Sequence, residues 1–180
     1  MPALTIMSGM TSLSFVLVWY FRQQTVRNMC RFSGHQGRGG MDQRIRDAIF
    51  REVAREPFAQ TLGMELKELE FGFSAVEMVY DPAAMNNLFA RAHGGAIFSL
   101  IDEAFETVCQ TVGLVTVALN VSVNFVSSPE SGARLRAEAR EVSSTKRTAS
   151  YDIRVSDGEG QLIAVCQALA YRTGKELPFL

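Results

Sequence analysis

A chain of 180 residues, 47% of them hydrophobic and with a formal net charge of −1, can bury one sizeable core. Residues 1–40 contain four arginines and no acid, so residues 41–180 hold 14 basic and 19 acidic side chains, which argues against nucleic acid as a partner. The three cysteines are odd in number and lack metal-ligand spacing, and only two histidines are present. We therefore expect reduced thiols, a cytoplasmic protein, and no metal or other cofactor.

The first forty residues permit two interpretations. Residues 1–21 carry no charge and include the apolar run 15–21, whose length is borderline for crossing a bilayer. Arginines follow this run, which is unlike a secretory signal and would suit an anchor with the domain on the cytoplasmic side. However, residues 32–40 resemble an untranslated region of a messenger RNA that has been read as protein. We favour a misassigned start over a membrane anchor, with 1–40 as an N-terminal extension and 41–180 as the domain.

The first half of this domain should begin with an amphipathic helix. Asp42 can cap that helix, and apolar residues recur at helical spacing through about Arg55. Pro57 interrupts the pattern, and Gly63 closes a short second turn. The elements expected next are a helical turn over 58–63, strands over 64–70 and 73–80, and a loop over 81–92.

A wide apolar stripe at 3.6-residue spacing runs from Ala96 to Val108, so this helix is the expected core element. It should end near Gly113. Four strands are expected after it, over 116–126, 134–140, 148–155 and 162–171. Alternating apolar and polar side chains in the first three are typical of antiparallel strands. We therefore predict an α+β fold in which a curved antiparallel sheet of five to six strands wraps around one long central helix.

The most informative segment joins a polar loop to this apolar helix through His93-Gly94-Gly95. A helix N-terminus presents unpaired N–H groups and the positive end of the dipole, and glycines let a ligand approach the backbone closely. This arrangement suits a carbonyl oxygen that becomes an oxyanion. On a helical wheel, Asp102 lies where the apolar stripe meets the polar face, which favours a semi-buried carboxylate. Glu103, the next candidate base, should point further into the polar face.

This motif carries a resemblance to a known family. The His-Gly-Gly turn, with Asn87 six residues before His93 and Asp102 eight residues after Gly94, resembles the signature of hotdog-fold acyl-CoA thioesterases. It is most similar to the phenylacetate-degradation thioesterase-like family, over about residues 41–172. The resemblance implies the hotdog fold and hydrolysis of an acyl- or arylacyl-CoA to the free acid and CoA. It also implies that Asp102 is the general base or the nucleophile, that the Gly94 N–H binds the thioester oxygen, and that Asn87 lies near the attacking water. The role of His93 is open between catalysis and a structural cap.

The resemblance further implies a site between two subunits of a homodimer or homotetramer, so that Asp102 of one chain faces Gly94 of the other. Gly95 would also contact the substrate. The CoA phosphates would lie near Thr145-Lys146-Arg147, although such a turn is usually solvated surface. Some family members have a serine where this chain has Ala118. A contribution from that position to placing the water is therefore in doubt.

The substrate pocket and three rival functions stay open. Four residues that could line an acyl pocket, with core packing as the default, are Met64, Met78, Met85 and Phe89. One rival is a non-catalytic acyl-CoA-binding hotdog protein. Another is a hydratase, which would require a second histidine motif that the chain lacks. The third is a membrane-associated thioesterase, if residues 1–40 are genuine.

Overall fold

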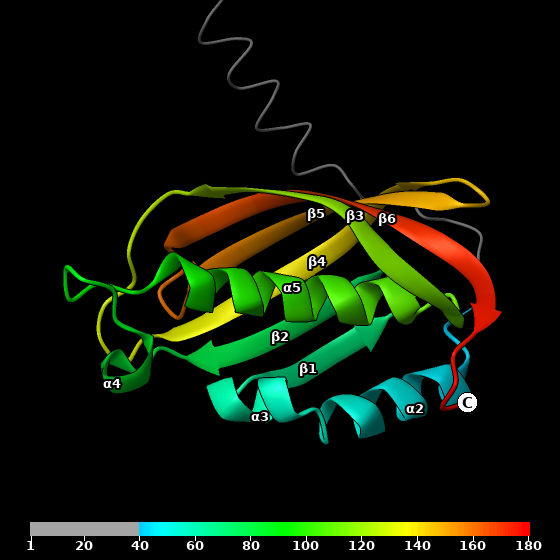
Figure 1. The fold of residues 1–180 in the computed structure, drawn as a ribbon, viewed down its shortest axis with the longest axis horizontal. Helices are drawn as coiled ribbons and strands as arrows, with labels where there is room; N and C mark the ends of the chain where they lie inside the picture. Colours follow the sequence, from blue (N-terminus) through cyan, green and yellow to red (C-terminus); the bar gives the residue numbers. More distant parts are fainter. Residues whose placement is uncertain (1–39) are drawn as a thin grey trace, which may run out of the picture. The chain divides into compact units, whose positions relative to one another are not determined.

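The computed structural model describes residues 40–180. Both interpretations of the N-terminal extension fall on residues 1–39, outside that range. Within residues 40–180, no helix is long and apolar enough to cross a bilayer. One six-stranded antiparallel sheet curves around a single long helix, α5 (Gly94–Gln110), as Figure 1 shows. The predicted α+β fold is thereby confirmed.

The sheet has two edges that matter for the site. Its strands lie in the order β1-β2-β4-β5-β6-β3, and every neighbouring pair is antiparallel. Their bounds are β1 (Glu65–Glu70), β2 (Phe73–Val79), β3 (Leu114–Phe125), β4 (Arg134–Ser144), β5 (Thr148–Asp157) and β6 (Leu162–Glu176). Short β1 and long β3 are therefore the edge strands. β6 extends beyond the predicted residue 171 because its end pairs with the start of β3, Leu114 opposite Glu176.

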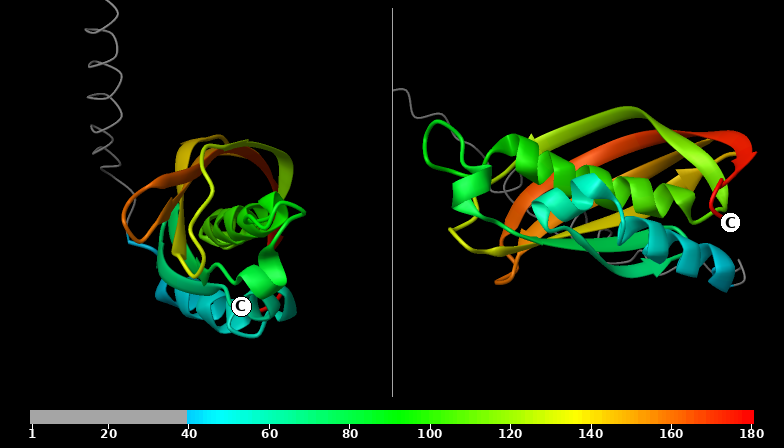
Figure 2. Two further views of the ribbon diagram at one scale, coloured as in Figure 1. Left: turned by 90° about the vertical axis from the view of Figure 1, so that its left-hand side faces the viewer. Right: turned by 60° about the horizontal axis from the view of Figure 1, so that its bottom comes forward.

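Three shorter helices complete the fold: α2 (Gln43–Val53), α3 (Pro57–Leu62) and α4 (Pro82–Met85). As predicted, the Asp42 carboxylate caps α2 by accepting a hydrogen bond from the Arg44 N–H at 2.8 Å. Gly63 ends α3 with a φ of 64°, a conformation that glycine adopts readily. α4 falls inside the segment predicted as a loop. Figure 2 shows the sheet curving around α5, with α2 and α3 (cyan) on the side that it leaves open.

The core lies between α5 and the concave face of the sheet. Six apolar side chains of α5 are at most 3% exposed: Ile97, Leu100, Ile101, Ala104, Phe105 and Val108. The Phe105 ring meets the Tyr151 ring of β5 edge to face, with centroids 5.3 Å apart. Burying each large apolar side chain stabilises the fold by about 1.5–3 kcal/mol, so this stripe fixes the orientation of α5 inside the sheet. Cys109 and Cys166 are buried free thiols, and Cys30 lies outside the described residues.

Candidate active site

His93 caps the start of α5 with its own side chain. Its Nδ1 accepts a hydrogen bond from the Gly95 N–H at 2.9 Å, and its backbone N–H donates to the Met85 carbonyl oxygen at 2.8 Å. A Cβ atom on Gly95 would lie 2.9 Å from that Nδ1. The second glycine is therefore needed to make room for the imidazole cap. This contact supports the structural interpretation of His93 and uses the Gly95 amide internally.

The Gly94 amide has no such partner. Its N–H makes no hydrogen bond within residues 40–180, whereas the Ala96 N–H is bonded to the His93 carbonyl oxygen. A Cβ atom on Gly94 would lie 3.2 Å from Cζ of Phe125, so that ring closes over the glycine. Phe125 was not recognised from sequence, because strand alternation alone does not show which ring meets a distant turn. The start of α5 thus offers one free donor beside an aromatic ring.

Asp102 lies two turns further along α5. It belongs to a stripe of α5 that is exposed in the single protomer, together with Phe98 and Glu106. Its carboxylate makes no hydrogen bond or ion pair with any residue from 40 to 180. Partial burial nevertheless raises the pKa of Asp102 above its ordinary value. An unpaired carboxylate with a raised pKa is suited to accepting a proton.

The distance between these two groups limits how they can act. Gly94 and Asp102 are eight residues apart on one helix, and a rise of about 1.5 Å per residue separates them by about 12 Å. A base and an oxyanion donor must both lie about 3 Å from the reacting groups. One copy of α5 therefore cannot present both groups to one carbonyl.

Asn87 organises the loop before α5. Its Oδ1 accepts hydrogen bonds from the N–H groups of Phe89 at 2.8 Å and Arg91 at 3.2 Å. Ala90, within that turn, adopts a positive φ of 54°. The neighbouring Asn86 is bound instead by the Tyr80 hydroxyl. The Asn87 side-chain oxygen is therefore used to shape the loop, which leaves its amide NH2 as the group available to a ligand.

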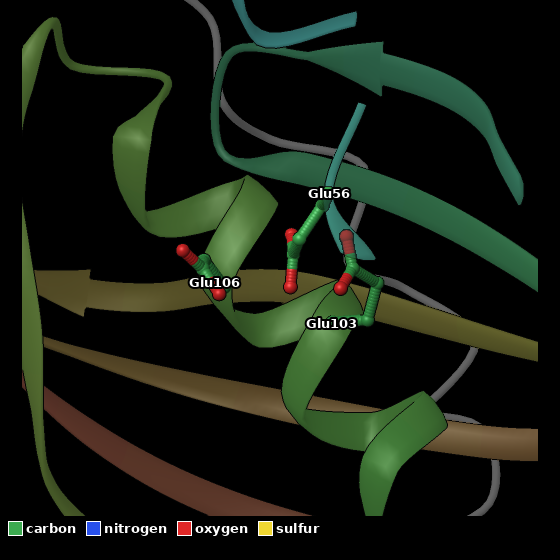
Figure 3. Close-up of side chains that lie close together, drawn as sticks. All are labelled: Glu56, Glu103 and Glu106. Atoms are coloured by element: carbon green, nitrogen blue, oxygen red, sulfur yellow. The ribbon is translucent and has the colours of Figure 1, made fainter. Parts of the chain in front are cut away.

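The expectation for Glu103 was wrong. Glu103 does not lie further out on the polar face but is only 3% exposed, while Asp102 is exposed. The helical wheel treats that face of α5 as solvated, whereas Glu56, just before α3, lies next to Glu103 there (Figure 3). Burial, and then the negative charges of Glu56, Glu106 and Asp102, raise the pKa of Glu103 to about 8.

The segment Thr145-Lys146-Arg147 is exposed and lies far from Gly94 in the same chain. It joins β4 to β5 at the end of the sheet opposite α4, near the C-terminal end of α5 (Figure 1). Thr145 Oγ1 accepts a hydrogen bond from the Arg147 N–H at 3.2 Å, and the Arg147 guanidinium donates to the Tyr171 hydroxyl at 3.0 Å. A single chain therefore does not bring this turn together with the start of α5.

The methionines proposed for an acyl pocket are core residues: Met64, Met78 and Met85 are at most 6% exposed, whereas Phe89 is 82% exposed. A cavity of about 580 Å³ lies elsewhere, between the α2–α3 segment, the second half of α5 and the start of β3. Its apolar wall includes Val53, Val117 and Phe179, and its polar wall includes Glu56 and Glu106.

Comparison with known proteins decides the family. A model of the thioesterase superfamily matches residues 89–164. The acyl-coenzyme A thioesterase PaaI of Escherichia coli is 32% identical over 116 residues, which are 64% of this chain and 82% of that protein. The chain belongs to the PaaI-like thioesterases of this superfamily. Thioester hydrolysis is thus its reaction, and the resemblance inferred from His93-Gly94-Gly95 and its neighbours is confirmed.

Solved structures agree with the hotdog fold of this thioesterase. The PaaI protein from the phenylacetic acid degradation operon of Escherichia coli superposes with a TM-score of 0.71 at 26% identity, over 76% of this chain and 98% of that one. The smu.793 protein of Streptococcus mutans, solved with acetyl CoA bound, gives a TM-score of 0.60 at 27% identity, over 63% and 91% of the two chains.

Proposed function

We propose that this thioesterase hydrolyses an acyl-CoA to the free acid and CoA in a site shared by two copies of the chain. The observation that carries the proposal is the separation on α5. The free Gly94 N–H and the unpaired Asp102 carboxylate of one chain lie about 12 Å apart. Gly94 of one chain would therefore act together with Asp102 of a second chain. The acyl-CoA named in the Escherichia coli relative supports this substrate class.

The second copy is expected to pair along β3. This edge strand is twelve residues long, and three of its apolar side chains, Val117, Leu119 and Phe125, are 44–57% exposed. A long, exposed apolar edge is a pairing surface that monomeric proteins avoid. Antiparallel pairing of two β3 strands about their middle would bring Phe125 and Gly94 of one chain toward the beginning of β3 in its partner.

Hydrolysis would then proceed with a complete set of groups. The thioester carbonyl oxygen accepts a hydrogen bond from the Gly94 N–H, at the positive end of α5. Asp102 of the second chain takes a proton from water, and the hydroxide attacks the carbonyl carbon. The oxyanion then reforms the carbonyl, the C–S bond breaks, and the CoA sulfur leaves and is protonated. In this proposal the free amide of Asn87 orients the water. Direct attack by Asp102, through an anhydride, is the alternative.

The substrate's two ends fit different surfaces. The cavity beside the second half of α5 has an apolar wall that suits an acyl or arylacyl group. The pantetheine and phosphates would run outward to the Thr145-Lys146-Arg147 turn of one of the two chains. Exposed Lys146 and Arg147 offer the cationic donors that phosphate prefers.

A mixing experiment tests the shared site. One chain carries Asp102→Asn and the other Gly94→Pro, and the two inactive proteins are denatured and refolded together. Random pairing should produce half mixed dimers, each with one intact site, and so restore about a quarter of normal activity. Mixed dimers confirmed by mass spectrometry but lacking activity would refute the shared site. If both single variants kept normal activity, the roles assigned to Asp102 and Gly94 would be refuted.

A further inference from the structure

Three glutamates gather on the side of α5 that faces α3, outside the proposed catalytic groups. Glu56 comes from the segment before α3, and Glu103 and Glu106 lie one turn apart on α5. One carboxylate oxygen from each lies within 4.8 Å of the corresponding oxygens of the other two. In Figure 3 the carboxylate of Glu103 faces that of Glu56 across the gap between the two elements.

The cluster has no compensating positive charge. No arginine or lysine between residues 40 and 180 forms an ion pair with any of the three carboxylates. Glu56 occupies the capping position of α3 but makes no capping hydrogen bond with its side chain. Its carboxylate is turned instead toward two others of like charge. With all three groups ionised this arrangement is unfavourable, unless a positive ion completes it or one carboxyl group keeps its proton.

Glu103 gives the second, independent sign of a ligand. Its side chain is 97% removed from solvent, yet its Oε1 has no hydrogen-bond partner in the part of the chain that is described. Buried polar atoms are nearly always paired, and leaving a carboxylate oxygen unpaired is strongly unfavourable. The carboxylate of Glu103 is held by a well-packed helix and faces that of Glu56, so it marks where a partner should lie.

We propose that Glu56, Glu103 and Glu106 bind one Ca²⁺ ion between α3 and α5. Calcium takes oxygen ligands at 2.3–2.6 Å, so ligands on opposite sides of the ion are about 4.6–5.2 Å apart. The three oxygens lie within 4.8 Å of one another, inside the span that the ligands of one Ca²⁺ ion cover. Magnesium demands near-ideal octahedral geometry and gives up its bound waters reluctantly, which makes it the weaker occupant of a site built from three carboxylates.

The cavity beside the cluster gives an ion access to it and provides room for water as further ligands. Glu106 is exposed, and both it and Glu56 line the 580 Å³ cavity, so hydrated ions can reach the cluster and water can fill the remaining coordination positions. Bound calcium would join the start of α3 to the middle of α5. Because an ion that binds only the folded state stabilises it, calcium should raise the unfolding temperature.

The test is a calcium titration of the full chain after removal of metal with EDTA and dialysis. Isothermal titration calorimetry near pH 8 should detect one Ca²⁺ per chain. Glu103→Gln and Glu106→Gln should each weaken binding by at least about tenfold, because affinity depends on the number of charged ligands. Glu159→Gln removes one exposed carboxylate from the β5–β6 turn and is the matched control, which should bind calcium normally.

Two outcomes would overturn the proposal: no saturable calcium binding up to about 1 mM, the range of weak protein sites, or binding unchanged in Glu106→Gln. Glu106 is the variant that decides if Glu103→Gln fails to fold by circular dichroism, since its side chain is exposed. Binding that favours Mg²⁺ over Ca²⁺ would overturn the assigned ion. These readouts do not depend on thioester hydrolysis, so they stand apart from the test of the shared site.

Discussion

The start of α5 and its middle differ in how their polar groups are paired. At residues 93–95 the backbone N–H groups of His93 and Gly95 have partners in the same chain, and the backbone N–H of Gly94 is left over. At residues 102–106 three carboxylates have no hydrogen-bonding or ionic partner in the described chain. The first region is complete within one chain, apart from the donor it offers. In our proposals the second region is completed from outside, by a second chain and substrate or by an ion.

The largest effect should follow from removing the proposed base. Asp102→Asn keeps the shape of the side chain but cannot accept the proton, so kcat should fall by about 10²- to 10⁴-fold. The dissociation constant for acyl-CoA should change little, because the Gly94 amide and the cavity are untouched. Steady-state kinetics and calorimetric binding measure the two quantities. A larger loss of kcat in Glu103→Gln than in Asp102→Asn would move the base one residue along the helix.

The start of α5 is tested by removing the backbone N–H of Gly94. Proline is well tolerated at the first position of a helix, and His93 already has the extended conformation, ψ 131°, that precedes proline. Gly94→Pro should therefore preserve the helix while lowering kcat by about 10²- to 10³-fold, as expected for loss of an oxyanion donor. Gly94→Ala is the matched control, since it adds a Cβ near Phe125 but keeps the N–H. Equal losses in both variants would attribute the effect to crowding.

A third test asks whether Asp102, in the middle of α5, needs a second chain for catalysis. Leu119 is 57% exposed at the middle of the β3 edge. Leu119→Asp should weaken self-association by about tenfold or more, because it places charge in the proposed apolar seam. Sedimentation equilibrium and activity at a series of protein concentrations should decline together. A variant that sediments as a monomer and keeps full activity would separate catalysis from assembly.

The smallest effect concerns the carboxylate cluster without metal. Glu103 keeps its proton in the folded protein up to about pH 8, whereas the unfolded chain loses it near the ordinary value of 4.5. The unfolded state therefore binds fewer protons between these values, and the free energy of unfolding should fall as pH rises from about 5 to 8. In EDTA, Glu103→Gln should show a shallower decline in melting temperature. Identical slopes for the two proteins would contradict this.

Features that depend on residues close together in the chain could be predicted from the sequence. The cap at Asp42, the turn at Gly63 and the apolar stripe of α5 depend on residues close together in the chain, and each was found as expected. The burial of Glu103 was missed because it depends on Glu56, which lies 47 residues earlier and is brought over α5 only by the tertiary fold. Phe125 was missed for the same reason, since its contact with Gly94 crosses 31 residues. Asn87 was found as a residue of interest, but its role in shaping the loop was not foreseen.

The position of β3 beside β6 has a consequence for how the chain folds. Within residues 40–180, residues 114–125 pair only with residues 164–176, so in this part of the chain β3 has no neighbour until β6 has been synthesised. Contacts between segments so distant in sequence form slowly, because the intervening chain must first be ordered. During that interval the apolar edge of β3 is open on both sides. Docking of β6 between β5 and β3 is therefore expected to be the folding step most prone to aggregation.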